Sequence, residues 1–286
     1  MSVRLVITDA MWDRIEPLMP ADPVRGRRWA DHRRTLEAIA WKYRTNSPWR
    51  DLPDELGSFQ TAHKRLIRWA VDGTWEMILA AVLAAADAED DLDGTVSVDS
   101  TVVRAHQHAA GALKRGWSAQ GEPADHALGR SRGGLSTKVH LAADGRARPL
   151  AFAVTAGQAG DAPAFETVMS RIRVPRTGPG RPRTRPLVVL ADRAYSSRAI
   201  RGHLRRRGIR AVIPQPSDQV GHRLRRGRRG GRPPGFDSQA YKQRNSVERC
   251  INRLKQWRGL ATRTDKLAIA YQAALHLAGI LIWIRR

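Results

Sequence analysis

The sequence has very little cysteine: Cys250 is the single one in 286 residues. One cysteine excludes an internal disulfide and any zinc site built from cysteine thiolates. Cys250 falls among the apolar residues of a predicted helix, so we expect a buried thiol. A chain without disulfides suits a reducing compartment, and we expect a cytoplasmic protein.

Long apolar runs are also absent, with one exception. The N-terminal "MSVRLVITDAMWDR" lacks the apolar core of about 7 to 15 residues that a signal peptide needs. Residues 267–286 are long enough to suggest a membrane span, but Tyr271, Gln272 and His276 interrupt them and no second span exists. This stretch therefore predicts a buried helix, and no membrane is expected as a partner.

Acidic residues are few compared with basic ones, 27 against 50, which gives a formal net charge of +23. Such a charge indicates a polyanionic partner. Arginine supplies 43 of the basic residues and lysine 7, and the arginine side chain is the better suited to bidentate phosphate contact. Residues 1–90 carry 13 basic and 14 acidic side chains, whereas residues 171–233 carry 19 and 2. The cationic surface is therefore predicted in the second half of the chain.

An acidic segment, "DAEDDLD" at residues 87–93, separates two kinds of sequence pattern. It predicts an all-helical domain over residues 1–88 and an α/β domain over 94–286, the latter with a basic insert at about 215–237. In the helical part, "SFQTAHKRLIRWAVDG" (58–73) has one apolar face and one basic face. Such a helix after a tight connection suits a helix-turn-helix-like DNA reader, while a plain helical bundle with a solvated basic face remains the alternative. The candidate DNA contacts on this helix are Lys64, Arg65 and Arg68.

After residue 94 the periodicity changes to that of strands. Three β-rich stretches come first, at 95–103, 137–143 and 149–156, and Asp144-Gly145 predicts a hairpin turn between the last two. A helix (161–172), a wholly apolar strand (186–192), a helix (196–207), a strand (210–214) and a final helix follow. This order predicts a ribonuclease-H-like α/β fold, a mixed sheet flanked by helices.

Two aspartates occupy unusual places in this predicted sheet. Asp99 lies inside the first strand, and Asp192 ends the apolar strand "LVVLA". A lone buried aspartate is often only a satisfied acceptor. In the ribonuclease-H-like order, however, the first and fourth strands are neighbours, so the two carboxylates are predicted to lie side by side, where Glu248 of the final helix can join them.

The final helix, "YKQRNSVERCINRLKQ" (241–256), carries a polar stripe beside its apolar face. At about 100° per residue, one arc of about 60° holds Tyr241, Arg244, Glu248 and Lys255. A surface ion-pair ladder would explain Arg244 and Glu248 at i,i+4. Three clustered carboxylates offer another reason, because they repel one another unless a cation joins them. Hard oxygen ligands favour two Mg²⁺ or Mn²⁺ ions about 4 Å apart. Glu248 would then turn to the ions, and phosphates would pass Tyr241, Arg244 and Lys255.

The sequence resembles the DDE transposases of bacterial insertion sequences. The resemblance is carried by Asp99 in "VSVDSTVVRAH", Asp192 in "VLADRAY" and Glu248 within the pattern Tyr-(2)-Arg-(3)-Glu-(6)-Lys, and by residues 48–76 and 129–166. Relatives commonly have Gly where this chain has Ala194. The resemblance implies Asp99, Asp192 and Glu248 as catalytic and metal-binding residues. It also implies binding of terminal inverted repeats, cleavage, strand transfer to target DNA, at least a dimer in a synaptic complex, and a bacterial, nucleoid-associated location.

Two rival functions remain open. A nuclease or resolvase of the same fold would use the same acids without joining DNA, and a non-catalytic DNA-binding descendant would have no use for an intact acid triad.

Other patterns yield weaker hypotheses. His106, His108 and His126 could indicate a metal site, but we expect them to be loop residues near DNA. "GRSRGGLSTK" lacks the ending of a phosphate loop, so no ATP dependence is expected. The segments 179–186 and 225–235 combine Arg with Gly and Pro, and we expect them to stay extended and follow phosphates, with insertion into a minor groove as the alternative.

Overall fold

The computed structural model describes residues 4–22, 28–112 and 119–285. Four helices form the N-terminal part, as the sequence predicts: α1 (Asp9–Ile15), α2 (His32–Thr45), α3 (Phe59–Val71) and α4 (Thr74–Ala88). Side chains cap the first two helices, since the side chain of Thr8 accepts from the amide of Met11 at 3.3 Å and that of Asp31 from the amide of Arg34 at 2.6 Å. Short 3-10 turns occupy Glu16–Leu18, Trp49–Asp51 and Asp54–Leu56.

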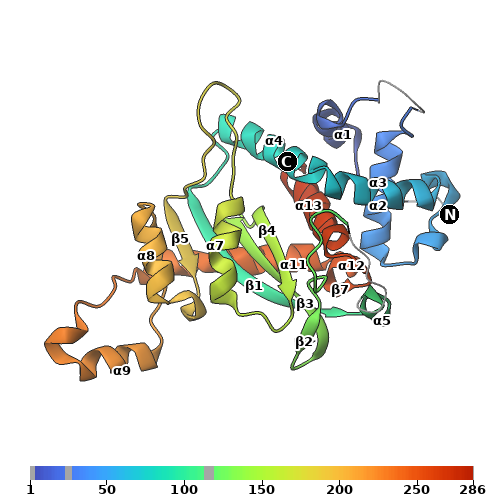
Figure 1. Cartoon of the computed structure of the whole chain (residues 1–286). Helices are drawn as coiled ribbons and strands as arrows, with labels where there is room; N and C mark the ends of the chain where they lie inside the picture. The colour runs from blue at the N-terminus through green and yellow to red at the C-terminus, as the bar shows by residue number, and fades with distance from the viewer. Residues whose placement is uncertain (1–3, 23–27, 113–118, 286) are drawn as a thin grey trace.

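A mixed sheet forms the centre of the molecule (Figure 1). Its strands are β1 (Thr95–Ala105), β2 (Gly129–Ser131), β3 (Gly134–Asp144), β4 (Pro149–Ala156), β5 (Val188–Ala191), β6 (Arg210–Val212) and β7 (Thr262–Arg263). Five of the strands follow the order β4-β3-β1-β5-β6, in which β1, β3 and β4 pair antiparallel while β5 and β6 run parallel to β1. This is the predicted ribonuclease-H-like arrangement, and it includes the predicted hairpin between β3 and β4.

The remaining helices are α5 (Gln107–Ala110), α7 (Asp161–Arg171), α8 (Arg198–Arg206), α9 (Ser217–Arg225), α10 (Ser238–Tyr241), α11 (Asn245–Lys255), α12 (Arg258–Ala261) and α13 (Ala268–Ile284). Helix α7 contacts β3 and β4, and α11 contacts β1 and β3. Alternate residues of β1 face different helices, because the Ser97 hydroxyl meets Ser246 of α11 at 2.9 Å while the Ser100 hydroxyl meets Asp161 of α7 at 2.6 Å. The two helices therefore cover opposite faces of β1.

The final polar helix differs from its prediction. The sequence predicts one continuous helix over residues 241–256, but a 3-10 turn (Lys242–Arg244) separates α10 from α11. A 3-10 turn has about 3.0 residues per turn against 3.6 in an α-helix, so it rotates Tyr241 relative to Glu248. Tight turns of this kind are common at the start of α-helices.

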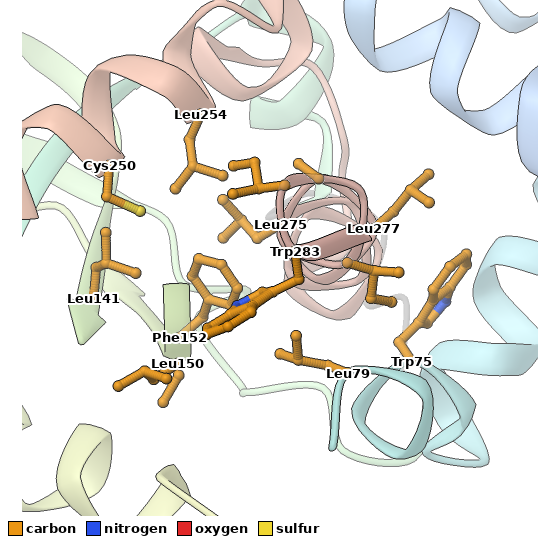
Figure 2. Close-up of a cluster of buried hydrophobic side chains, with 14 of the residues drawn as sticks. Trp75, Leu79, Leu141, Leu150, Phe152, Cys250, Leu254, Leu275, Leu277 and Trp283 are labelled. Atoms are coloured by element: carbon orange, nitrogen blue, oxygen red, sulfur yellow. The ribbon is translucent and has the colours of Figure 1, made fainter. Parts of the chain in front are cut away.

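Helix α13 joins the N-terminal helices to the sheet. It contacts α3 and α4 on one side and β4 on the other, and one hydrophobic cluster runs through all of them. Figure 2 shows Leu275, Leu277 and Trp283 of α13 between side chains of the sheet and of α4. The prediction of a buried C-terminal helix is confirmed. In the described part of the chain no single helix is long and apolar enough to cross a membrane, and only α3 with α4, bent by 72°, pass that test as a pair.

The indole of Trp283 is a suitable place to test this shared core. It is fully buried, it donates to the carbonyl of Pro149 at 2.7 Å, and the guanidinium of Arg148 lies 3.8 Å from its ring centre. We expect Trp283→Ala to lower the free energy of unfolding by about 3 to 5 kcal/mol, because it leaves a large cavity and an unpaired carbonyl. Urea denaturation measures this loss.

Met77→Ala on α4 is the matched control, because Met77 is 52% exposed. We expect a change of about 0.5 kcal/mol or less there. Similar losses in the two variants would contradict the role given to α13.

Candidate active site

Asp99 and Asp192 lie on neighbouring parallel strands. Val98 of β1 pairs with Ala191 of β5, so the two aspartates are the next residues along each strand. Asp192 follows the last residue of β5, where its carboxylate accepts from the amide of Ala194 at 2.8 Å. Asp99 accepts from the amide of Ser100 at 2.8 Å. Parallel pairing thus brings the two carboxylates together although 93 positions separate them in the sequence.

Arg244 connects Asp99 to Glu248. One guanidinium nitrogen, Nη2, lies 2.7 Å from Asp99 Oδ2, and the other, Nη1, lies 2.8 Å from Glu248 Oε1. The Asp99 and Arg244 side chains are 18% and 19% exposed, whereas Glu248 is 49% exposed. The i,i+4 pair on the helix is therefore more than a surface ladder, since the same arginine reaches a strand 145 positions earlier.

The pKa values of this cluster reflect crowded charge. Burial raises the pKa of Asp99 above its ordinary value, and the charges of Asp192 and Glu248 raise it further, while the Ser100 amide and Arg244 oppose the rise. The pKa of Tyr241 is raised mainly by burial, and the three acids raise it too. Asp99 thus releases its proton more easily when a cation lies beside it.

The donor set suits a hard divalent ion, but the side chains are not arranged around one. Among residues 4–22, 28–112 and 119–285, no group of three or more His, Cys, Asp or Glu side chains has the spacing of a metal site. Arg244 lies between two of the acids and supplies the positive charge they require. Asp99 and Asp192 nevertheless provide adjacent carboxylate oxygens, which are the ligands that Mg²⁺ and Mn²⁺ prefer. The chemistry of the donors therefore fits such an ion.

Lys255 and Tyr241 lie at the edges of this cluster. The Lys255 ammonium donates to the hydroxyl of Thr101 at 2.6 Å, two residues beyond Asp99 on the same face of β1. Burial lowers the pKa of Lys255. The ring of Tyr241 lies 5.2 Å from that of Phe236. Arg244 and Lys255 of the final helix thus contact the middle of β1, and Tyr241 lies near enough to the acids for their charges to raise its pKa.

A polar network beneath the acids was missed by the sequence analysis. The Asp161 carboxylate accepts from Ser100 at 2.6 Å and from Lys138 at 3.1 Å, and Tyr195 is buried nearby. Burial raises the pKa of Tyr195, and Asp161, Asp99 and Asp192 raise it further. Ser100 and Asp99 are consecutive, so this network holds the strand from the face opposite the acids. A possible signal was the first-turn position of Asp161 in the helix predicted at 161–172.

One of the three candidate DNA contacts on α3 is not on the exposed face of the helix. Lys64 and Arg68 are exposed on α3, but Arg65 is buried. Its guanidinium lies 3.7 Å from the ring centre of Trp29 and 3.0 Å from Nδ1 of His32. A planar guanidinium stacks well on aromatic rings, and because of this stacking the Arg65 side chain is buried and not on the basic face of α3. Arg68 also lies over Trp29, at 4.5 Å.

The basic segments are less extended than predicted. Residues 225–235 include a 3-10 turn at Gly227–Gly230, after helix α9, which buries no side chain and projects away from the sheet (Figure 1). In the segment 179–186, Arg183 forms a β-bridge with Val174 and an ion pair with the carboxylate of Asp87 on α4. Arg183 is thus engaged within the protein, because the 5% exposed Asp87 needs a partner.

The three histidines divide between two environments. His106 and His108 are exposed, with ring centres 4.6 Å apart. His126 is buried and 2.7 Å from a carboxylate oxygen of Glu122, which also accepts from the first amides of α13. His126 lies in a loop, as expected, but its ring faces an acid that caps α13, and its proximity to DNA stays a prediction.

Known proteins resemble this chain over different shares of its length. It is 38% identical over 110 residues to an uncharacterized protein, y4sN, of Sinorhizobium fredii, covering 38% of this chain and 83% of that protein. It is 27% identical over 151 residues to the "Putative transposase for insertion sequence element IS6501" of Brucella ovis, covering 53% of this chain and 100% of that protein. Among solved structures, the Mos1 strand transfer complex aligns at 13% identity and a TM-score of 0.28, covering 85% of this chain and 80% of that one.

Family models match both parts of the chain. The model described as "Putative transposase of IS4/5 family" matches residues 7–79, and the model "Transposase DDE domain" matches residues 91–283, which is more than half of the chain. The second match includes Asp99, Asp192 and Glu248. The chain therefore belongs to the transposase family that carries the DDE domain.

Proposed function

We propose that this protein binds the terminal inverted repeats of its insertion sequence and catalyses metal-dependent cleavage and strand transfer of DNA. The observation that carries the proposal is that Asp99, Asp192 and Glu248 lie together where β5 ends beside the middle of β1, with Arg244 between Asp99 and Glu248. The crowded carboxylates would hold metal ions on one side of a phosphodiester substrate, and the cationic side chains lie on the other side. Cations on both sides would stabilise the negative charge of that substrate.

Asp99, Asp192 and Glu248 would hold two Mg²⁺ or Mn²⁺ ions, which supply an activated hydroxyl and stabilise the leaving oxygen when bound. Arg244 would exchange its carboxylate partners for a phosphate of the substrate. Lys255, fixed by Thr101, and the hydroxyl of Tyr241 would contact neighbouring phosphates. Both cleavage and joining are in-line displacements at phosphorus, so the same residues serve both.

Further contacts with double-stranded DNA would come from outside the acid cluster. Lys64 and Arg68 are exposed on α3 and would contact the phosphates of the inverted repeat. Helix α9 and the turn after it present arginines such as Arg225, Arg226 and Arg228 on an element without buried side chains. Two DNA ends must meet during strand transfer, so the active species would be at least a dimer.

A strand-transfer assay tests the proposal against its nearest rival. With pre-cut repeat ends, Mg²⁺ and a target plasmid, we expect covalent joining of the 3′-hydroxyl ends to the plasmid. A nuclease or resolvase of the same fold would cut without joining, and a non-catalytic descendant would bind DNA and yield no product. Inverted repeats on either side of the coding region would supply the ends for this assay.

Removal of any one acid should abolish the chemistry. For Asp99→Asn, Asp192→Asn and Glu248→Gln we expect Mg²⁺-dependent cleavage to fall about 10³-fold or more, since a metal contributes several kcal/mol to the transition state. DNA binding, measured by fluorescence anisotropy, should persist.

Asp13→Asn on α1 is the control, because Asp13 is an exposed acid far along the chain from the site. It should cleave at the normal rate. Full cleavage by any of the three site variants would remove that residue from the proposed set.

Arg244→Gln should separate metal binding from DNA binding. Loss of the guanidinium leaves Asp99 and Glu248 without their cation, so we expect tighter Mn²⁺ binding in the absence of DNA, by about tenfold. Affinity for DNA should fall at the same time, because a phosphate contact is lost. Calorimetry with MnCl₂ and anisotropy with repeat DNA measure the two effects.

Arg249→Gln on the same helix is the matched control, since Arg249 is exposed and not part of the acid cluster. Equal or weaker Mn²⁺ binding by Arg244→Gln would show that the arginine does not compete with the metal.

A further inference from the structure

Ser100 connects Asp99 to helix α7, on the other face of the sheet. Its backbone amide donates to Oδ1 of Asp99 at 2.8 Å, and its hydroxyl donates to Oδ1 of Asp161, the first residue of α7, at 2.6 Å. Successive residues of a strand point to opposite faces, so Asp99 and Ser100 face different helices. A contact made on the α7 face therefore reaches the Asp99 carboxylate through a single residue.

The stretch of β1 that begins at Asp99 has little support from strands on one side. In the part of the chain that the structure describes, the pairing of β1 with β5 ends at Val98, and its pairing with β7 begins only at Arg104. Strand β3 pairs with the other side of β1 along this whole stretch. Side-chain contacts have to replace the missing neighbour, and the Ser100 hydroxyl provides one from the α7 face.

The Asp161 carboxylate is itself held in place. The oxygen that accepts from Ser100 also accepts from the ammonium of Lys138 at 3.1 Å, and the Asp161 and Lys138 side chains are 28% and 13% exposed. His140 lies beside them, with Nδ1 4.0 Å from the same oxygen. Burial lowers the pKa of His140 to about 4, so its ring is neutral at pH 7. Lys138 is therefore the cation that orients Asp161 toward the serine hydroxyl.

Helix α7 also contacts the turn that follows Asp192. Phe165, one helical turn beyond Asp161, is fully buried, and its ring centre lies 5.7 Å from that of the buried Tyr195. Tyr195 is the last residue of a 3-10 turn (Arg193–Tyr195) that the Asp192 side chain caps. One helix is thus attached to the residues next to both aspartates.

These attachments bear on the spacing of the two carboxylates. Two carboxylates that share a metal ion must be held to within about 0.5 Å of the productive geometry. Residues that contact metal ligands, and not the metal, commonly provide this precision, and their loss costs about 10- to 100-fold in metal affinity or activity. Asp161 and Ser100 stand in this relation to Asp99.

We propose that Asp161 is a positioning residue for the acid site: through the Ser100 hydroxyl it holds Asp99 at the distance from Asp192 that a shared divalent ion requires. Asp161 touches neither the ion nor the DNA in this role. The inference rests on the proposed function, which assigns the ions to these acids. The alternative is an ion pair in which Asp161 only neutralises Lys138.

Calorimetric titration of the whole chain with MnCl₂, in the absence of DNA, tests the inference. We expect Ser100→Ala and Asp161→Ala each to weaken Mn²⁺ binding about tenfold, because Asp99 is no longer held in place. The double variant should bind Mn²⁺ as weakly as either single variant, since both changes remove the same hydrogen bond. Unchanged affinity in the two single variants, or losses that add in the double variant, would overturn the inference. Thermal melting checks that all variants are folded.

Asp161→Asn separates the hydrogen bond from the ion pair. The amide oxygen still accepts from the Ser100 hydroxyl, whereas the negative charge beside Lys138 is gone. We expect Mn²⁺ affinity within about threefold of that of the unsubstituted protein. An equal loss in Asp161→Asn and Asp161→Ala would favour the ion pair and rule out the route through Ser100.

Two matched controls lie on the same helix. Glu166→Ala removes a 57% exposed acid that pairs with His203 of α8, and Ser170→Ala removes an exposed hydroxyl that donates to the carbonyl of Thr167 on α7 itself. Both should bind Mn²⁺ and cleave DNA at the normal level, because these partners lie outside β1. Ser100→Ala and Asp161→Ala should cleave about tenfold more slowly with unchanged DNA affinity.

Hydrogen exchange of the amides in residues 99–103 gives a readout that needs no metal. We expect Asp161→Ala to speed exchange there about tenfold, and to leave residues 95–98, which pair with β5, unchanged. Faster exchange with normal Mn²⁺ affinity would show that Asp161 only stabilises β1, against the positioning role. Absence of Mn²⁺ binding by the unsubstituted protein would contradict the proposed function instead. In that case unchanged exchange also overturns the present inference, and faster exchange upholds the contact through Ser100.

Discussion

The parallel pairing of β1 with β5 is the constraint on which the rest of the site depends. It places Asp99 beside Asp192 in a sheet where one of them is largely removed from water. Two carboxylates so close repel each other unless a cation accompanies them. In the structure that cation is the guanidinium of Arg244. The fold thus places repelling carboxylates together beside β1, and a cation from the final helix stabilises them.

The acids on both faces of β1 have cationic or hydroxyl partners of their own. On one face Arg244 and Lys255 bind Asp99 and Thr101. On the other face Lys138 and Ser100 bind Asp161, so that acid has its own partners and does not compete for Arg244. Charges on the two faces of β1 are therefore balanced separately.

Helix α13 gives the N-terminal helices a fixed position relative to the sheet, because all of them share one hydrophobic cluster. The two-domain division suggested by the acidic segment stays a prediction. The same packing creates a cavity lined by Trp49 and Lys266, since its walls come from segments on both sides of that division. The exposed side chains of Lys64 and Arg68 on α3 are thereby held at a set distance from the acids.

Local chemistry in the sequence determined the elements. Thr8 and Asp31 cap their helices, alternating residues form the strands, and the order of strands and helices predicts the sheet in which Asp99 and Asp192 are neighbours. Only the tertiary structure decided the partners of long side chains. Arg65 is not on the basic face of α3 because its guanidinium stacks on Trp29, and Arg183 forms an ion pair with Asp87. Such partners come from residues far apart in sequence, and no local spacing encodes which of them a flexible charged side chain meets.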